Sequence, residues 1–200
     1  MTEKGSAAHF EERRREMDKV YVFLADGFEE VEGLTVVDIL RRAGADVTTV
    51  SIGADTMIRG SHGISVMADE LFDENALADG DLYVLPGGMP GTLHLGEHEG
   101  LGRVLISAKK NGKKIAAICA APSVLGALGL LEGEKAVCYP GMEEKLHGAE
   151  TGTEEVVRSG QITTSRGVGT AIPFALELTA QLKGRETADR IAGSIVFRSC

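Results

Sequence analysis

Cysteine is scarce in this sequence, and positive charge is not in excess. Only three cysteines, Cys119, Cys138 and Cys200, occur in 200 residues, widely spaced and without a CxxC pair. We therefore expect no disulfide framework, no structural zinc and a reducing, cytoplasmic environment, with Cys200 exposed as the last residue. The formal net charge of −9 disfavours binding to nucleic acid or to an anionic membrane, because both need a basic face.

Long hydrophobic runs are also missing. No apolar run approaches the roughly 20 residues that a membrane-spanning helix requires. Residues 1–16 are polar and charged and lack the apolar centre of a signal peptide, so none is expected. We interpret residues 1–16 as a flexible N-terminal extension and residues 17–200 as a single domain, which at 43% hydrophobic content is large enough to bury a core.

The sequence does contain an alternation of short apolar runs and helical patterns, which is typical of an α/β fold with a parallel sheet. A hairpin insertion is expected within residues 55–70, and a second hairpin at 155–165, with a glycine turn. The expected strands are 20–24, 47–51, 82–85, 114–118 and 136–140, and the expected helices are 29–42, 98–110, 123–128, 171–182 and 186–193.

The most informative stretch is residues 114–122, KIAAICAAP, which indicates a strand, a sharp turn and a helix with Cys119 at the corner. Such a corner exposes the nucleophile of many hydrolases. Pro122 suits the first turn of the helix, and the helix dipole favours a thiolate. On this stretch alone, an inert buried cysteine is an equally good interpretation.

Glu32 is the second informative residue. It shares one helix face with Val36, Ile39 and Leu40, which predicts that its carboxyl group packs toward the sheet. Burial raises the pKa of a carboxyl group and suits it to proton transfer. Glu29 and Glu30 are better explained as negative charge that complements the helix dipole.

Two glycines, Gly87 and Gly88, directly follow the strand 82–85. They place bare backbone N–H groups at the carboxyl edge of the sheet, where such groups can form half of an oxyanion hole. The loop does not match a phosphate-binding motif. His62, His94 and His98 are interpreted as surface histidines rather than as catalytic groups or metal ligands.

These motifs, taken in order with Thr164–Thr170, TSRGVGT, resemble the ThiJ/PfpI superfamily, in the branch of the Parkinson-disease-linked protein deglycase and its bacterial relatives. The resemblance covers residues 18–197. It implies a flavodoxin-like three-layer sandwich with a mainly parallel sheet, usually a homodimer. It also implies that no metal or other cofactor takes part.

The resemblance further implies that Cys119 is the reactive residue and that Glu32 hydrogen-bonds to it. The oxyanion-type N–H groups map to Gly88 and Ala120. Many members of this branch carry a histidine at the position of Tyr139, so proton transfer here falls more heavily on Glu32 or on water. Ala120 stands where the protease-like members have histidine, which argues against that activity.

Two functions follow from the same residues. In the first, Cys119 attacks a small 2-oxoaldehyde, Glu32 shuttles a proton and water releases a 2-hydroxy acid, as in a glyoxalase III or protein-deglycase-like enzyme. In the second, Cys119 is oxidised to a sulfinate that Glu32 stabilises, in a redox-sensing, stress-response or chaperone-like protein. A catalytically idle relative is the third interpretation.

Overall fold

The structure of the protein is a computed structural model, which describes residues 18–198. Within these residues the central sheet has seven strands in the order β10-β11-β7-β6-β1-β2-β5, parallel throughout except for the antiparallel edge pair β10–β11. Its strands are β1 (Lys19–Leu24), β2 (Asp46–Ser51), β5 (Glu70–Leu71), β6 (Leu82–Leu85), β7 (Lys114–Ile118), β10 (Val156–Ser159) and β11 (Ile162–Ser165).

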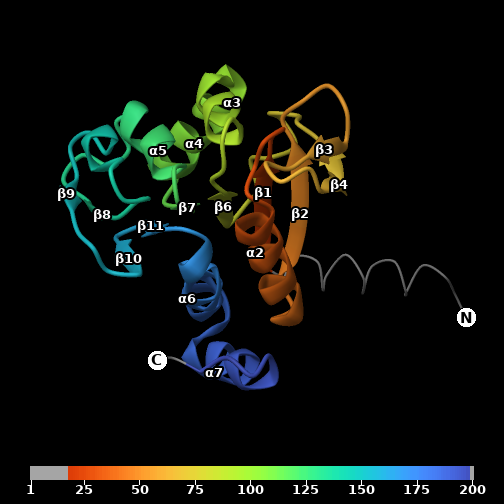
Figure 1. Cartoon of the computed structure of the whole chain (residues 1–200), viewed down its shortest axis with the longest axis vertical. Coiled ribbons are helices and arrows are strands. Elements are labelled where there is room, and N and C mark those ends of the chain that lie inside the picture. The colour runs from red at the N-terminus through yellow and green to blue at the C-terminus, as the bar shows by residue number, and fades with distance from the viewer. Residues whose placement is uncertain (1–17, 199–200) are drawn as a thin grey trace, which may run out of the picture.

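Helices cover both faces of this sheet. In Figure 1, α2, α6 and α7 lie on one side of the strands and α3, α4 and α5 on the other. The helices are α2 (Glu30–Arg42), α3 (Gly91–Glu97), α4 (Glu99–Lys110), α5 (Pro122–Ala127), α6 (Ala171–Lys183) and α7 (Arg185–Ser194), with short 3-10 turns at Glu143–Lys145 and Val168–Thr170. This arrangement confirms the expected α/β sandwich with a mainly parallel sheet.

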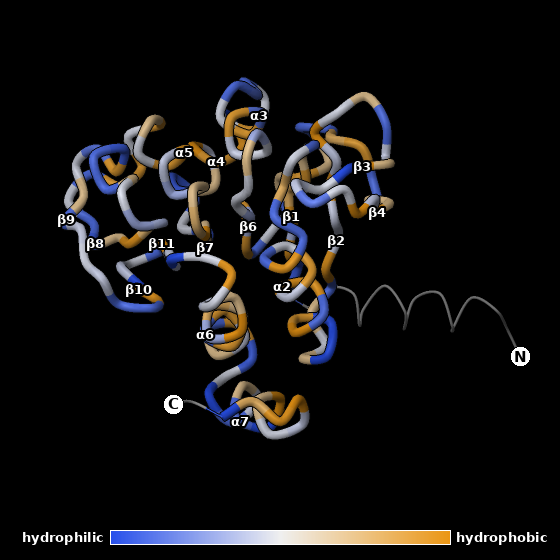
Figure 2. Tube along the Cα trace, in the orientation of Figure 1, coloured by the Kyte–Doolittle hydropathy of each residue, from blue (hydrophilic) through white to orange (hydrophobic). Residues whose placement is uncertain are grey.

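The two cores follow from the alternation of side chains along each strand. In β1, Val20 and Val22 face the cluster that contains α2 and α6, while Tyr21 and Phe23 face the cluster that contains α4 and α5. Strand β1 is therefore apolar on both faces, as expected of a strand between two helix layers. In Figure 2 the tubes of α2 and α6 alternate between hydrophobic and hydrophilic residues, as expected for helices that cover a sheet.

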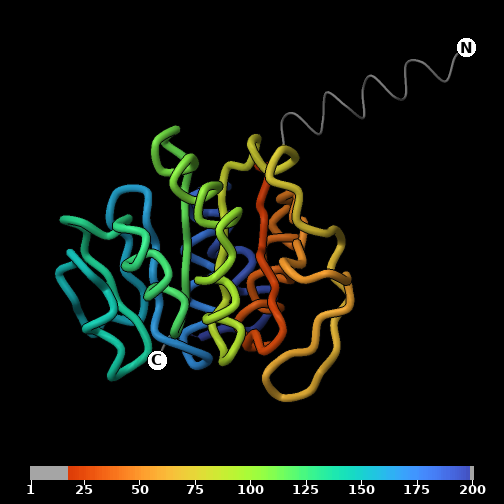
Figure 3. The backbone as a smooth tube through the Cα atoms, turned by 90° about the horizontal axis from the view of Figure 1, so that it is seen from above, coloured from red at the N-terminus to blue at the C-terminus, as the bar shows by residue number. Residues whose placement is uncertain are grey.

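Two small pairs of strands lie outside the main sheet, one antiparallel and one parallel. The hairpin of β3 (Met57–Arg59) and β4 (Ser65–Met67) confirms the insertion expected within residues 55–70. The second pair joins β8 (Lys135–Ala136) to β9 (Glu150–Thr151). Figure 3 shows these segments at opposite ends of the molecule, the first in orange and the second in cyan.

Two sequence expectations are corrected by the structure. The strand expected at 136–140 ends at Ala136, because the next N–H groups bond elsewhere: that of Val137 to the Thr164 hydroxyl and that of Tyr139 to the Cys119 carbonyl. Helix α3 was not expected, since residues 91–97 contain two glycines and no clear apolar stripe.

The topology creates a crevice at the carboxyl edge of the sheet. From β1 the chain moves outward to β2 and then returns to β6 on the other side of β1. Open α/β sheets bind ligands at such a reversal of strand order. Among residues 18–198, no helix has the length and apolar character needed to cross a bilayer.

Candidate active site

Four neighbouring strands deliver the site residues. Because β11, β7, β6 and β1 are adjacent and parallel, the segments that follow them meet at one edge. They supply, in that order, residues 166–170, Cys119, the pair Gly87–Gly88, and the first turn of α2 with Glu32. The structure thus brings together all four residues that the sequence singled out, Cys119, Glu32, Gly88 and Ala120.

Cys119 occupies the corner between β7 and α5 with a backbone φ of 64°. A positive φ is uncommon for a residue with a side chain and is typical of a nucleophile elbow. The corner is held because the Cys119 N–H donates to the Ser165 carbonyl at 2.9 Å, and Pro122 occupies the first turn of α5 as expected. The Cys119 side chain is therefore directed to the crevice and is half-buried.

Glu32 is fully buried, which confirms the inward face expected from its spacing in α2. Its Oε2 accepts a hydrogen bond from the Gly87 N–H at 2.9 Å, whereas the buried Oε1 has no partner among the described residues. Burial raises the pKa of Glu32 to about 7, against the opposing hydrogen bonds from Gly87 and Cys119. Glu32 is consequently poised to gain or lose a proton near neutral pH.

The Cys119 thiol does not show the lowered pKa expected from its place before a helix. Burial raises its pKa first, and the negative charge of Glu32 raises it further, while the N–H groups of Ala120 and Gly88 act in the opposite direction. The contribution of Glu32 applies only while that carboxyl group is ionised. Protonation of Glu32 therefore removes one obstacle to the thiolate and leaves the two N–H donors in place.

An open cleft of about 790 Å³ surrounds the thiol. Tyr139 lies on its rim with half of its surface exposed, in a turn rather than in the expected strand. The remaining walls come from α2, the β3–β4 turn and the loop after β11, and the lining residues include Glu29, Val31, Glu32, His62, Arg166 and Val168.

Glu29, Glu30 and His62 form a cluster beside Cys119 that the sequence did not predict. Glu30 is buried and is not the simple helix-end charge that was expected. Burial alone would raise its pKa, but hydrogen bonds from the His62 side chain and from nearby backbone N–H groups lower it to about 2. The ligand atoms of the three residues lie within 4.8 Å of one another. Because the Glu30–His62 hydrogen bond already joins them, we interpret the cluster as an ion pair rather than as a metal site.

His94 and His98 are not part of the cleft. His94 is exposed and hydrogen-bonds to the Asp26 carbonyl at 2.9 Å. His98 is half-buried: its Nδ1 accepts from the Leu101 N–H and so caps α4, and its ring contacts Phe72. Cys138 is buried in the core away from the cleft, and Cys200 lies outside the described residues.

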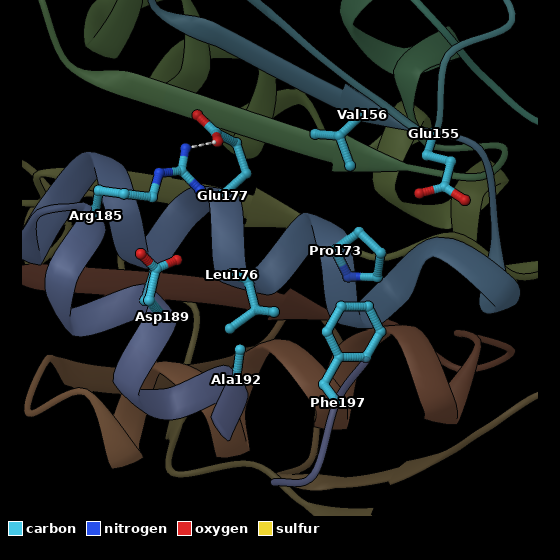
Figure 4. A pocket seen from close by; sticks show the side chains of 10 residues that line it. Glu155, Val156, Pro173, Leu176, Glu177, Arg185, Asp189, Ala192 and Phe197 are labelled. Atoms are coloured by element: carbon cyan, nitrogen blue, oxygen red, sulfur yellow. Dashed lines mark hydrogen bonds and ion pairs between the residues drawn. The ribbon is translucent and has the colours of Figure 1, made fainter. Parts of the chain in front are cut away.

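A second cavity, of about 550 Å³, lies on the face covered by α6 and α7. Figure 4 shows its floor of Pro173, Leu176 and Phe197 and, at one end, the ion pair between Arg185 and Glu177, whose atoms are 2.9 Å apart. It contains neither a cysteine nor a histidine. The cleft at Cys119 is therefore the candidate active site.

His62 and Arg166 are the cleft residues that sequence reasoning missed. The turn Gly60-Ser61-His62-Gly63 is visible in the sequence, but nothing in it indicates that the hairpin folds back onto α2. Arg166 belongs to a motif that the sequence did single out, although no role followed from the motif.

The fold and the cleft define a class: a doubly wound α/β protein with a cysteine at a strand-to-helix elbow and a buried carboxyl group beside it. The chain belongs to the DJ-1/PfpI family, whose family model matches residues 18–181.

Proteins similar to this chain carry DJ-1 names. It is 41% identical over 182 residues, 90% of its length, to Protein DJ-1 homolog B of Arabidopsis thaliana, and it spans 42% of that relative. It is 31% identical over 165 residues to the glutathione-independent glyoxalase DJR-1.2 of Caenorhabditis elegans, covering 82% of this chain and 87% of the relative. The structure of oxidized Toxoplasma gondii DJ-1 superposes with a TM-score of 0.86 at 39% identity, over 91% of this chain and 100% of that one.

Proposed function

We propose that this chain is a cysteine-dependent, glyoxalase- or deglycase-like enzyme that acts on small 2-oxoaldehydes or their adducts without metal or glutathione. The observation that carries the proposal is the pairing of Cys119 with Glu32, a buried carboxyl group with a pKa of about 7 and one oxygen that has no hydrogen-bond partner among residues 18–198. The similarity to a nematode protein named as a glutathione-independent glyoxalase supports it.

The residues divide the reaction as follows. The Cys119 sulfur bonds to the aldehyde carbon to give a hemithioacetal, and the N–H groups of Gly88 and Ala120 stabilise the developing oxyanion. Glu32 then moves a proton from the first carbon to the second, which converts the hemithioacetal into a thioester. Water hydrolyses the thioester, releasing a 2-hydroxy acid and restoring the thiol.

The test is lactate formation from methylglyoxal. We expect turnover by the wild type, none by Cys119→Ala, and a loss of about 10²-fold or more in Glu32→Gln, because an amide cannot transfer the proton. Cys138→Ala is the matched control, since it removes a thiol outside the cleft. Lactate formation that persists in Cys119→Ala would contradict the proposal.

A second candidate function is redox sensing, in which Cys119 is oxidised to a sulfinate that Glu32 stabilises. It is favoured by Glu32 Oε1, which has no partner among the described residues and can donate a hydrogen bond to a sulfinate oxygen when the carboxyl group is protonated, and by the N–H groups of Ala120 and Gly88, which also donate toward this sulfur. Peroxide titration followed by intact mass should add two oxygen atoms to Cys119, and Glu32→Gln should alter where oxidation stops. A Cys119 that resists peroxide while Cys200 reacts would count against this function.

We also propose that the chain forms a homodimer through an exposed apolar patch. Leu34 on α2, Ile172 on α6 and Val196 beyond α7 are large, exposed hydrophobic residues that line one shallow hollow. Large apolar side chains exposed together, here with Asp38 and Arg42 beside them, are typical of a protein interface. Val31, one turn before Leu34, is exposed as well and lines the Cys119 cleft, so a partner on this patch would lie close to the site.

A further inference from the structure

We propose that His62, held on the carboxylate of Glu30, is the cationic hydrogen-bond donor that binds the second oxygen of a dicarbonyl substrate in the Cys119 cleft. The inference rests on the proposed glyoxalase function and deepens it. Cys119 attacks the aldehyde carbon of the substrate, and His62 donates a hydrogen bond to the oxygen of the neighbouring carbon. Glu30 acts through His62 and is a positioning residue.

The carboxylate of Glu30 fixes the position of His62. One oxygen of Glu30, Oε1, accepts the backbone N–H groups of His62 at 2.8 Å and Ile64 at 3.3 Å. The other, Oε2, is 2.9 Å from His62 Nδ1. A side chain at Gly60 would overlap the Glu30 carboxylate, so this glycine lets the turn close over it. A buried carboxylate therefore holds both the backbone and the ring of His62.

The imidazole ring of His62 is exposed, although the groups that hold it are buried. The His62 side chain is 68% exposed, whereas its partners Glu30 and Glu29 expose only 4% and 11% of theirs. His62 also borders the same cleft as Cys119 and Glu32. Because Nδ1 is engaged by Glu30, the nitrogen left for a ligand is Nε2.

The carboxylates beside His62 favour a positive charge on its ring. The hydrogen bond to Glu30, followed by the charges of Glu29 and Glu30, raises the pKa of His62 and so shifts the ring toward its imidazolium form. Besides Glu29, the other charged or titratable groups of the cleft are Arg166, Glu32, Cys119 and Tyr139. When His62 loses its proton, the remaining hydrogen stays on Nδ1 facing Glu30. Nε2 then changes from a donor to an acceptor.

A hydrogen-bond donor at this place stabilises the negative charge that develops during the reaction. Glu32 removes the proton from the first carbon of the hemithioacetal, and the electron pair left behind forms a double bond to the second carbon. The product is an enediolate, whose negative charge lies on the oxygen of the second carbon. A hydrogen bond from Nε2 stabilises that charge as it develops. Glu32 returns the proton to the second carbon, and the proton of the first hydroxyl passes through water to the second oxygen. The step is an internal isomerisation and needs no oxidant or reductant.

Substitutions of His62 test the proposal through lactate formation from methylglyoxal between pH 6 and pH 9. His62→Ala should lower kcat/KM about tenfold at pH 6.5, less than the ~10²-fold loss that follows removal of a buried oxyanion-hole donor. Added imidazole should restore part of the loss. In the wild type, kcat/KM should fall at alkaline pH as His62 loses its proton; we call this fall the alkaline decline. His62→Arg should remain active and should lose the part of the alkaline decline that His62 causes, because arginine stays charged.

Three further measurements separate this role from a structural tether. Glu30→Gln should move the alkaline decline to lower pH, because the variant lacks the Glu30 charge that helps to raise the pKa of His62. Alkylation of Cys119 by iodoacetamide should be unchanged in His62→Ala, which shows that the nucleophile is intact. His147→Ala, an exposed histidine outside the cleft, is the matched control and should behave as the wild type.

The outcomes that overturn the proposal are distinct from failure of the proposed function. Wild-type activity in His62→Ala, no rescue by imidazole, or an unaltered alkaline decline in His62→Arg would reduce His62 to a tether for the hairpin. Absence of lactate with the wild type itself would overturn the glyoxalase function and this inference together.

Discussion

At the scale of single residues, Gly87 decides how closely Cys119 and Glu32 approach each other. A Cβ atom at this position would lie 2.6 Å from the Cys119 Cβ and 2.8 Å from Glu32 Oε2. We expect Gly87→Ala to destabilise the fold by about 1–3 kcal/mol, because the added methyl group overpacks a buried contact. Urea unfolding measures this cost, and the rate of Cys119 alkylation measures the displacement of the thiol.

The matched control is a glycine with open space around it. Gly193 lies in α7, has an ordinary helical backbone, and a Cβ there would meet nothing within 4 Å. Gly193→Ala should stabilise the protein by up to about 1 kcal/mol, because alanine is the better helix former. Equal effects of the two substitutions would contradict the argument from close approach.

The carboxyl group of Glu32 makes stability depend on pH. Its pKa is 4.5 when unperturbed and about 7 in the folded chain, so its favourable contribution is complete below pH 4.5 and is lost as pH rises through 7. We expect the free energy of unfolding to fall by about 3 kcal/mol from this group over that range. Urea titrations from pH 4.5 to pH 7.5 measure the slope.

Glu32→Gln is the control for this slope, because the amide does not ionise yet can still accept the Gly87 N–H. The variant should lose the Glu32 part of the pH dependence and keep that of His62, whose raised pKa acts in the same direction. An identical slope in the variant would show that Glu32 is not the group that titrates.

The contrast between Glu32 and Glu30 shows what a sequence can predict about a site. The burial of Glu32 followed from helical spacing, since its face also carries Val36, Ile39 and Leu40. Glu30 is buried by contacts with a hairpin more than thirty residues away, at His62 and Ile64. Periodicity within one helix contains no information about such a contact.

At the scale of elements, one buried hydroxyl fixes the segment that carries Tyr139 to the cleft. The Thr164 Oγ1 on β11 accepts a hydrogen bond from the Val137 N–H at 2.9 Å. Thr164→Val keeps the shape and leaves that buried N–H without a partner, which should cost about 1–3 kcal/mol. Amide hydrogen exchange should show faster exchange at Val137 and Tyr139.

The control for this element is Thr153→Val, at an exposed threonine with no side-chain hydrogen bond among the described residues. It should change stability by less than about 0.5 kcal/mol. Unchanged exchange at Val137 in Thr164→Val would mean that the hydroxyl does not hold the segment.

Strands and helices with strong patterns were predictable, and those defined by tertiary bonds were not. The strand 82–85 and the helices 29–42 and 171–182 agree with β6, α2 and α6 to within one residue at each end. The segment 136–140 has strand-like residues, but its N–H groups bond to Thr164 and Cys119 instead of to a neighbouring strand.

At the scale of the whole molecule, the proposed dimer makes a prediction of its own. Leu34→Glu places a charge in the apolar patch, and we expect it to convert a dimer into a monomer in light scattering after size-exclusion chromatography. Leu93→Glu, at an exposed leucine on α3, is the control and should leave the mass unchanged. A monomeric wild type would refute the dimer and leave the enzymatic proposal standing.

The corner at Cys119 also has a consequence for how the protein is made. Its N–H group is held by Ser165, its sulfur faces Glu32, and the cleft wall extends to Thr170. Domains emerge from the ribosome N-terminal end first, so a nascent chain still short of Ser165 carries an ordinary thiol with a pKa of about 8.5. The character of this sulfur is therefore acquired only after the segment from Ser165 to Thr170 has been synthesised, and thiol labelling of stalled chains would report when the domain closes.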